Sequence, residues 1–573
     1  MDKSKKYIPT HEQIIKNFEK ACAFNEQIGL FDQVTVNENF FIGNQWEGVE
    51  ANGLPTPTYN MFKRVVNFQV STITSDNLVI RALPMPSTSK LKLKELEKIA
   101  EIVSQQFSFI VQRNRIVAKN REFLRNAAVT GDGCMHFYFD PTIENGQDVK
   151  GEIVAEIIDN LRVMFGNPNC RDVQAQPYIM LYRREIADEV KYRAEQYKDA
   201  GECEIDDIES IKPDTEKFQN KYDSYTDDKV TVITYYFRNR ATKTIWCIEA
   251  TEQGILRKAY DTEYTLYPLI WINWDYIRDC YHGQAMVTGL LPNQKFINKM
   301  FALVSISQLT TSFPKIIYDR TRISKWDGGV GTAVGVQGNV NDVARVIEGA
   351  NLSPQIAQFI EMAFDKTHSL LGASDVAMGD SRPDNTSAII ALQRAANTPM
   401  ELTKQNDHQC LEDAGRIWID MMAVRYGTRM VETTMDIDEA GAQPLGMDLP
   451  EQTFMRPFDF STLKDYQLTI EQEVGASAYW SEMATMQTLD NLLMNKLITP
   501  EQYIVRLPNG YINKKEELLA ELRASRLPAP PVNTGTNMSV ETTSEDIPVE
   551  GGSGNAALQR ALNREGGIKD GNS

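Results

Sequence analysis

The chain lacks most of the signatures by which metalloproteins and disulfide-bonded proteins are recognised. Its 573 residues include only five histidines and seven cysteines, and no two cysteines form a Cys-x-x-Cys pair. The odd number and wide scatter of the cysteines favour free thiols in a reducing compartment. His408 and Cys410 lie two residues apart, which places them on different faces of a helix and argues against a zinc site. We therefore expect no metal site and no cofactor.

Long apolar runs are also absent. The longest, around residues 300–306, is far shorter than the ~20 residues that cross a bilayer. Residues 1–10 have no apolar segment typical of a signal peptide. We expect a protein that does not contact a membrane and that is assembled in a cytoplasm.

Enzyme motifs are missing as well. The sequence has no Gly-x-Ser-x-Gly elbow, no His-Glu-x-x-His and no phosphate loop with its lysine. Residues 436–441 begin like a calcium loop, but Ala440 stands where an oxygen ligand belongs and Met447 where a bidentate Glu belongs. We therefore predict that the chain is not an enzyme. Divalent-metal chemistry at Asp375, Asp380 and Asp384 stays open as an alternative.

The formal net charge of −18 is unevenly distributed and argues against a protein that coats nucleic acid. Residues 283–427 hold 13 Lys and Arg against 14 Asp and Glu, so the acidity lies elsewhere. Residues 202–228 contain ten acidic and three basic residues. This composition favours a solvated surface segment over a strip that binds a partner.

The nearly neutral centre of the chain has the most distinctive pattern. Apolar residues recur at helical spacing over residues 286–311, 354–371 and 388–427, and Pro399 should kink the last of these helices. Residues 312–352 contain short β-type runs and glycines, which predict strands and tight turns. Residues 372–387 are small and polar, which is typical of a mobile loop.

The flanking regions predict a mixture of helices and strands. The pattern predicts a helix over residues 11–28 and a further helical segment over residues 37–42 that ends at Gly43. Trp46 follows and is expected to anchor the chain. The other expected segments are helices over 91–129 and 183–197, strands over 134–140 and 151–165, an antiparallel sheet of 229–237, 244–250 and 266–273, a mixed region at 430–473, helices over 485–522 and disorder over 528–573.

Three groups of residues carry a family resemblance through their order. The first is residues 39–46, followed by Pro57, Asn60 and an expected helical stretch that runs to Pro84. The second comprises residues 281–287 and 290–298, and the third is Leu371-Gly372, a polar loop and Ser387-Ala388 before a long helix. Together they resemble the portal proteins of tailed bacteriophages.

The resemblance implies an α+β, mainly helical, portal-type fold that assembles as a ring of twelve. Its regions would be a wing (1–282 and 428–475), a first stem helix (283–311), a clip (312–352), a second stem helix (353–371), a tunnel loop (372–387), a long kinked wing helix (388–427), a crown (476–527) and a disordered tail (528–573). Residues 202–228 match no part of the family.

The resemblance also implies a function. Such a ring is the channel at one capsid vertex of the virion for packaging and ejecting double-stranded DNA. Its expected partners are the terminase large subunit, a head-tail adaptor, and the major capsid and scaffold proteins. The expected tunnel-loop contacts with DNA are Asp375, Asp380, Arg382, Asp384 and Asn385, and the expected clip contacts with the motor or adaptor are Arg320, Arg322, Lys325 and Trp326.

Two other classes stay open from the sequence. One is another head-to-tail structural protein, such as an adaptor or minor capsid component, although the length argues against an adaptor. The other is a metal-dependent hydrolase at the carboxylates named above. Trp326 could equally be a core residue.

Overall fold

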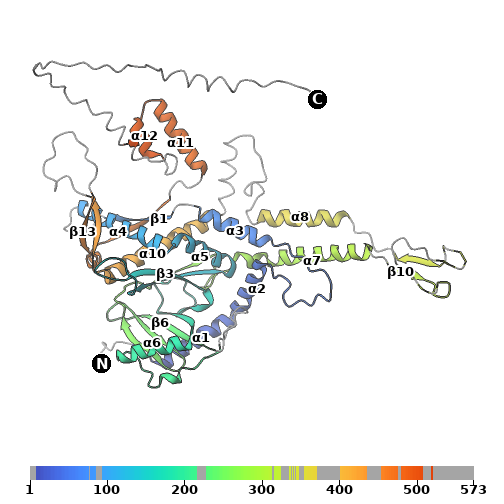
Figure 1. Ribbon diagram of the computed structural model, residues 1–573, viewed down its shortest axis with the longest axis horizontal. Helices are drawn as coiled ribbons and strands as arrows, with labels where there is room; N and C mark the ends of the chain where they lie inside the picture. Colours follow the sequence, from blue (N-terminus) through green and yellow to red (C-terminus); the bar gives the residue numbers. More distant parts are fainter. Residues whose placement is uncertain are drawn as a thin grey trace, which may run out of the picture. The chain divides into compact units, whose positions relative to one another are not determined.

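The computed structural model describes most of the chain (Figure 1). The described ranges are residues 8–75, 78–85, 93–215, 228–312, 315–323, 343–347, 354–370, 400–434, 453–474 and 479–507, together with residues 325, 335–336, 338–339, 341 and 518–519. The chain divides into two units, Met1–Thr485 and Met486–Ser573.

Helices form the N-terminal part of the first unit. They are α1 (His11–Gln27), α2 (Leu30–Ile42), α3 (Met61–Ile73), α4 (Leu93–Arg113) and α5 (Ile116–Thr130). A capping box of Thr10 and Gln13 begins α1, and α2 ends at Gly43 with a left-handed φ of 100° that suits glycine. Arg115, with φ 52°, separates α4 from α5. The predicted helices over 11–28, 37–42 and 91–129 are confirmed.

Two antiparallel sheets follow. A three-stranded sheet has the order β3-β2-β9, and a five-stranded sheet has the order β4-β5-β6-β7-β8. The strands are β2 (Asp132–Asp140), β3 (Glu152–Ile158), β4 (Val163–Phe165), β5 (Tyr178–Ile186), β6 (Lys229–Arg238), β7 (Ile245–Ala250), β8 (Ile255–Asp261) and β9 (Leu269–Asn273). Helix α6 (Ala187–Asp199) follows β5, and short 3₁₀ helices lie at Asn160–Arg162 and Ile208–Ser210.

The structure corrects three predictions. Residues 183–186 belong to strand β5, because β5 pairs with β6 over its full length, and helix α6 begins only at Ala187. Residues 269–273 form a strand, but it pairs with β2 and not with β6 or β7, since Trp271 lies opposite Cys134. The helical stretch expected to reach Pro84 ends at Ile73, and β1 (Leu78–Pro84) is a strand.

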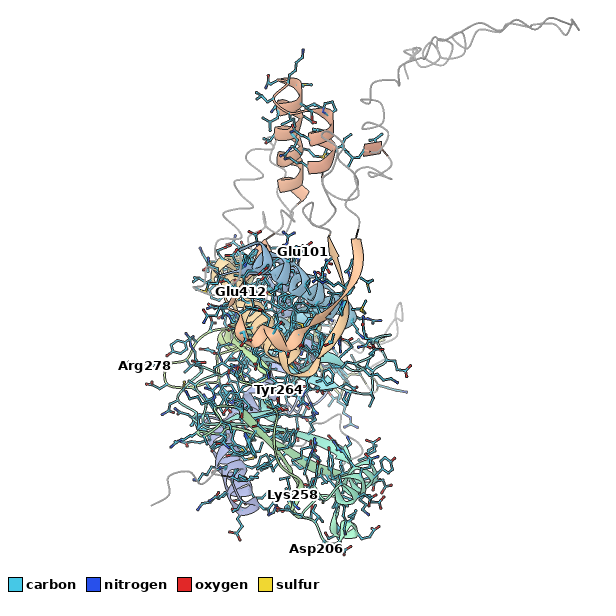
Figure 2. The ribbon with its side chains drawn as sticks, turned by 90° about the vertical axis from the view of Figure 1, so that its left-hand side faces the viewer. Glu101, Asp206, Lys258, Tyr264, Arg278 and Glu412 are labelled. Atoms are coloured by element: carbon cyan, nitrogen blue, oxygen red, sulfur yellow. The ribbon has the colours of Figure 1, made fainter. Side chains whose placement is uncertain are left out.

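The described part of the acidic segment 202–228 is held by contacts with the rest of the fold. It is therefore not the purely solvated surface segment that its composition favoured. Ile205 and Ile211 are buried in a cluster with α6 and β6. Glu202 pairs with Arg257 at 3.0 Å, and Asp214 pairs with Arg184, whose side chain is only 2 % exposed. Figure 2 shows Asp206 and Lys258 at the same end of this region.

A helix pair with a β-hairpin between its members comes next along the chain. Its elements are α7 (Met286–Ser312), β10 (Lys315–Tyr318), β11 (Ala344–Ile347) and α8 (Pro354–Leu370). Strands β10 and β11 pair antiparallel, so the expected helix, strand and helix order is confirmed. In Figure 1, α7 and α8 lie side by side and β10 lies beyond their shared end.

The long helix α10 (Glu401–Arg425) forms part of the largest core. Trp418 on α10 is fully buried between Phe107 and Phe137, with ring centroids 5.6 Å away in both cases. The chain continues through β12 (Thr428–Thr434), β13 (Thr453–Asp459), a 3₁₀ helix at Phe460–Asp465 and β14 (Leu468–Val474). Strand β12 pairs with β13, and β14 returns to pair with β1.

Helices also form the described part beyond β14, as expected. They are α11 (Tyr479–Met494) and α12 (Pro500–Arg506), and Thr499 caps α12 with a capping box immediately before Pro500. Within the second unit, the Tyr503 hydroxyl donates to Asp490 at 2.6 Å.

All seven cysteines are free thiols, as predicted. Among the described residues, no helix has the length and apolar character needed to span a membrane.

Candidate functional site

We call the first turns of helix α7, together with residues 281–285 before it, the base of the helix. Several hydrogen bonds to other parts of the fold hold this base. The motif at residues 281–287 leads directly into α7, which begins at Met286. Three separate sets of contacts hold the first turns of the helix, and each set uses a different part of the fold.

The first set centres on the Asp132 carboxylate at the start of β2, which is fully buried. It accepts hydrogen bonds from the Gly283 backbone N–H at 2.6 Å and the Asn273 side chain at 2.7 Å. His282 Nδ1 lies 2.6 Å from the other oxygen, and His282 Nε2 lies 3.3 Å from Asn25 Oδ1 on α1. One carboxylate therefore ties α7 to β2 and β9, and through His282 to α1.

Close backbone packing explains the glycines beside this carboxylate. A Cβ atom on Gly283 would lie 2.7 Å from Asn273 Cβ and 2.8 Å from Asp275 O. A Cβ atom on Gly131, whose φ is 106°, would lie 2.6 Å from Gly283 O. Only glycine fits both positions without movement of the backbone.

The second set is a network of buried amides. Asn298 on α7 donates to Gln45 Oε1 at 2.6 Å, and Gln294 donates to the Tyr59 carbonyl at 2.5 Å. Gln45 in turn donates to the Phe40 carbonyl at 3.0 Å. Gln45, Gln294 and Asn298 are all buried, so these hydrogen bonds form away from solvent, where an unmade bond is costly.

The third set joins α2 to α7. The Thr288 hydroxyl accepts from Asn37 at 2.8 Å and from Gln33 at 3.0 Å. Asn37 is fully buried and also donates to the Val129 carbonyl at the end of α5. Together with the Gln45–Asn298 hydrogen bond, these contacts place residues 39–46 beside residues 281–298, two motifs of the resemblance that lie more than 200 residues apart.

Trp46 is anchored as the sequence predicted, and its hydrogen bond goes to the loop that follows it in the chain and not to α7. Its indole N–H donates to the Pro57 carbonyl at 3.0 Å, and Asn60 donates to the Phe41 carbonyl at 2.8 Å. These bonds fold residues 43–60 into the loop that presents Tyr59 to α7, where its ring stacks on Phe301 at 3.9 Å.

Beyond its base, the helix pair exposes large apolar side chains. On α7, Leu303 is 60 % exposed and Leu309 is 50 % exposed. On α8, Met362 and Phe359 are about half exposed, and the Phe359 ring meets Phe296 of α7 edge-on at 5.9 Å. Both helices of the pair therefore leave large apolar side chains in contact with solvent.

The helix pair carries few charges. The charged residues of α7 are Lys295 and Lys299, and those of α8 are Glu361, Asp365 and Lys366. All of them are exposed. Neither sign dominates, so the pair does not present the clustered cations that hold phosphate.

Three of the predicted docking residues lie close together after β10. Arg320, Arg322 and Lys325 are exposed. Arg322 Nε lies 3.6 Å from Asp319 Oδ2, a long ionic contact. Hydrogen bonds from the Thr321 hydroxyl and N–H lower the pKa of Asp319, which keeps that carboxylate charged and the turn closed. Trp326 lies outside the described residues.

The other predicted site residues also lie outside the described residues. They are the expected loop contacts Asp375, Asp380, Arg382, Asp384 and Asn385, and the expected kink at Pro399. Where the structure is described, no three His, Cys, Asp or Glu side chains are grouped so as to hold a metal ion.

Comparison with known proteins identifies the family. The family of phage P22-like portal proteins matches residues 16–250 and 238–455, which is more than half of the chain. The chain therefore belongs to the phage P22-like portal protein family. No curated protein matches it significantly.

Membership defines the class of function. Proteins of this family are structural and act as head-tail connectors at a capsid vertex of the phage virion. They self-assemble and have capsid and packaging-related partners. The resemblance drawn from the order of motifs is thus confirmed.

Proposed function

We propose that the chain assembles as a ring of twelve and forms the channel through which double-stranded DNA is packaged and ejected. The assignment of wing, stem, clip, tunnel loop and crown to the ranges given above is part of this proposal. The observation that carries it is the α7–α8 helix pair, in which hydrogen bonds hold the start of α7 and both helices expose large apolar side chains.

The helix pair supports a stem that packs against copies of itself. Leu303, Leu309 and Met362 cannot be buried within a single helix pair, because they remain about half exposed or more beside their nearest neighbours in the chain. Ring closure buries such a surface by repeating one contact between neighbouring subunits.

The charge distribution supports a passage in which DNA slides. A channel lined by clustered Lys and Arg would hold the duplex, since each phosphate contact must break before the DNA advances. Residues 283–427 are nearly neutral, and twelve chains that each carry −18 repel phosphate overall. The ring thus favours movement of DNA over retention.

We place the narrowest point of the channel at residues 372–387, with weak contacts to DNA through Arg382, Asn385 and small polar groups. Asp375, Asp380 and Asp384 outnumber Arg382 there and keep the contact weak. DNA crosslinking in filled particles should label this loop. Labelling of the crown alone, with this loop unmarked, would contradict the placement.

The turn after β10 is the proposed contact with the terminase large subunit during packaging and with a head-tail adaptor afterwards. Arg320, Arg322 and Lys325 form an exposed basic group, and the clip range as a whole carries five bases against four acids. Trp326 follows directly and would supply an aromatic anchor. We further propose that the ring also contacts the major capsid and scaffold proteins and that it assembles in the host cytoplasm.

Charge reversal tests the docking surface. Arg320→Glu with Arg322→Glu should weaken binding of the terminase large subunit to assembled rings about tenfold or more, the loss expected for ~1.4 kcal/mol or more. Arg278→Glu is the matched control, because Arg278 is 88 % exposed and lies in the connection after β9 (Figure 2). Intact rings that bind the motor equally well in all three proteins would rule out this assignment.

A further inference from the structure

A small cavity lies where α5, α10 and β14 meet, away from the helix pair. Its lining includes Asn120 of α5, Asp407 and His408 of α10, and Gln472 of β14. The centre of a water-sized sphere can occupy a volume of about 20 Å³ inside the cavity. A single water needs ~10–15 Å³ on this measure, so one water-sized particle fits and a larger molecule does not.

The cavity is unusual because three of its side chains have oxygen atoms without partners. Asp407 Oδ1, Asn120 Oδ1 and Gln472 Oε1 are all buried, and none has a hydrogen-bond partner. Asp407 is itself only 2 % exposed, and its other oxygen accepts from Asn120 Nδ2 at 3.1 Å. That bond uses the Asn120 nitrogen, so the Asn120 oxygen is left without a partner.

Three unpaired acceptors require a donor or a positive charge. A water can donate only two hydrogen bonds, so it leaves one acceptor and the carboxylate charge uncompensated. A cation can take oxygen ligands from several side chains, so one ion in the cavity compensates the carboxylate charge as well as the unpaired amide oxygens. Carboxylate and amide oxygens are hard ligands that suit sodium-like or calcium-like ions and not zinc or copper.

Charge balance selects among the hard cations. Among the described residues that line the cavity, Asp407 is the one carboxylate, and a buried site is least costly when its charges cancel. A single positive charge neutralises it, whereas a divalent ion leaves a buried surplus. We propose that Asp407, Asn120 and Gln472 bind one monovalent metal cation of the size of sodium, which ties α5, α10 and β14 together.

The proton is the natural competitor for this site. Burial raises the pKa of Asp407 to about 7, against a hydrogen bond from Asn120 that lowers it. The pKa of an unfolded aspartate is ~3.9, so between these values the folded chain binds more protons than the unfolded chain. Without a cation, stability therefore falls as the pH rises from ~4 through ~7, and a bound cation restores it above that range.

Two other titratable groups lie near Asp407, and the raised pKa of the Cys410 thiol keeps that thiol protonated across this pH range. His408 lines the cavity beside it, and Cys410 lies on the same helix with a thiol pKa that burial and Asp407 raise. The other described lining residues outside α10 are Ile73, Thr74, Leu78, Val117, Asn120 and Gln472, none of which titrates. A variant at Asp407 itself therefore separates its contribution from that of His408.

Thermal unfolding of the full chain in sodium chloride or choline chloride, at equal ionic strength, tests the proposal. Choline has the same charge but is too large for the cavity. At about pH 8.5 we expect the unfolding midpoint to be higher in sodium by roughly 2 °C, and at about pH 5 we expect no difference because the proton occupies Asp407. Asp407→Asn should abolish the sodium effect and preserve the shape of the site.

Asp413→Asn is the matched control, because Asp413 lies on the same helix, half-buried, and pairs with Arg416. It should retain the sodium effect. If Asp407→Asn does not fold, Gln472→Leu should raise the sodium concentration needed for half of the effect. Equal midpoints in sodium and choline at about pH 8.5 would overturn the proposal and indicate that the Gln472 amide turns to donate to Asp407. Greater stabilisation by calcium than by sodium would overturn the single-charge assignment.

Discussion

At the scale of single residues, the junction at Asp132 is the feature that the sequence did not disclose. Nothing in the local pattern identifies one aspartate among 78 acidic residues as the acceptor that anchors α7. The available signal was its position between Gly131 and Gly133, since paired glycines mark a close approach of the backbone. Its partners Asn273, His282 and Gly283 lie about 140 to 150 residues further along the chain, beyond the reach of any periodicity.

The prediction at this scale concerns two glycines near the start of α7. Gly283→Ala places a methyl group within 2.8 Å of Asn273 and Asp275, so we expect a loss of ~1–3 kcal/mol in the free energy of unfolding. Gly289→Ala meets no atom within 4 Å and should be neutral or stabilise by up to ~1 kcal/mol. Urea unfolding of both variants measures the difference, and equal stability of the two would contradict the packing described here.

At the scale of elements, local periodicity predicted the helices and failed at the sheets. Helices α1 and α8 have apolar residues at helical spacing, and most backbone hydrogen bonds of a helix lie within the helix itself. Residues 266–273 alternate like a strand, but alternation does not reveal the partner. The strand pairs with β2, in which Cys134 lies opposite Trp271, although these two residues are 137 positions apart in the sequence.

The error at residues 183–186 has a similar cause. Arg183 and Arg184 carry charges that fit the exposed face of a helix when read locally. In the structure Arg184 is buried against Asp214, and β5 is held by pairing with β6 across more than 40 residues. A long-range ion pair thus outweighs local propensity.

The prediction at this scale concerns the exposed face of α7. Leu303→Glu should prevent ring formation and leave each chain folded, because the carboxylate cannot be buried between neighbouring stems without a partner. Tyr192→Glu adds the same charge at a side chain that is 65 % exposed on α6, and rings should form normally. Light scattering after size-exclusion chromatography gives the masses, and normal rings of Leu303→Glu would remove α7 from the subunit interface.

At the scale of the whole molecule, the order of motifs was more informative than any motif alone. Residues 39–46 and 281–298 are loose patterns in the sequence, yet the structure joins them through Gln45, Tyr59, Gln294 and Asn298. The predicted contacts with DNA and the kink at Pro399 stay predictions, because those residues lie outside the described ranges.

In the proposed assembly, several copies of this acidic chain close around a passage for DNA. Electron microscopy of the purified full chain, with native mass spectrometry of the same sample, tests it most directly. The account predicts closed rings of twelve subunits around an axial opening. Single chains at every concentration, or closed assemblies without an opening, would contradict it.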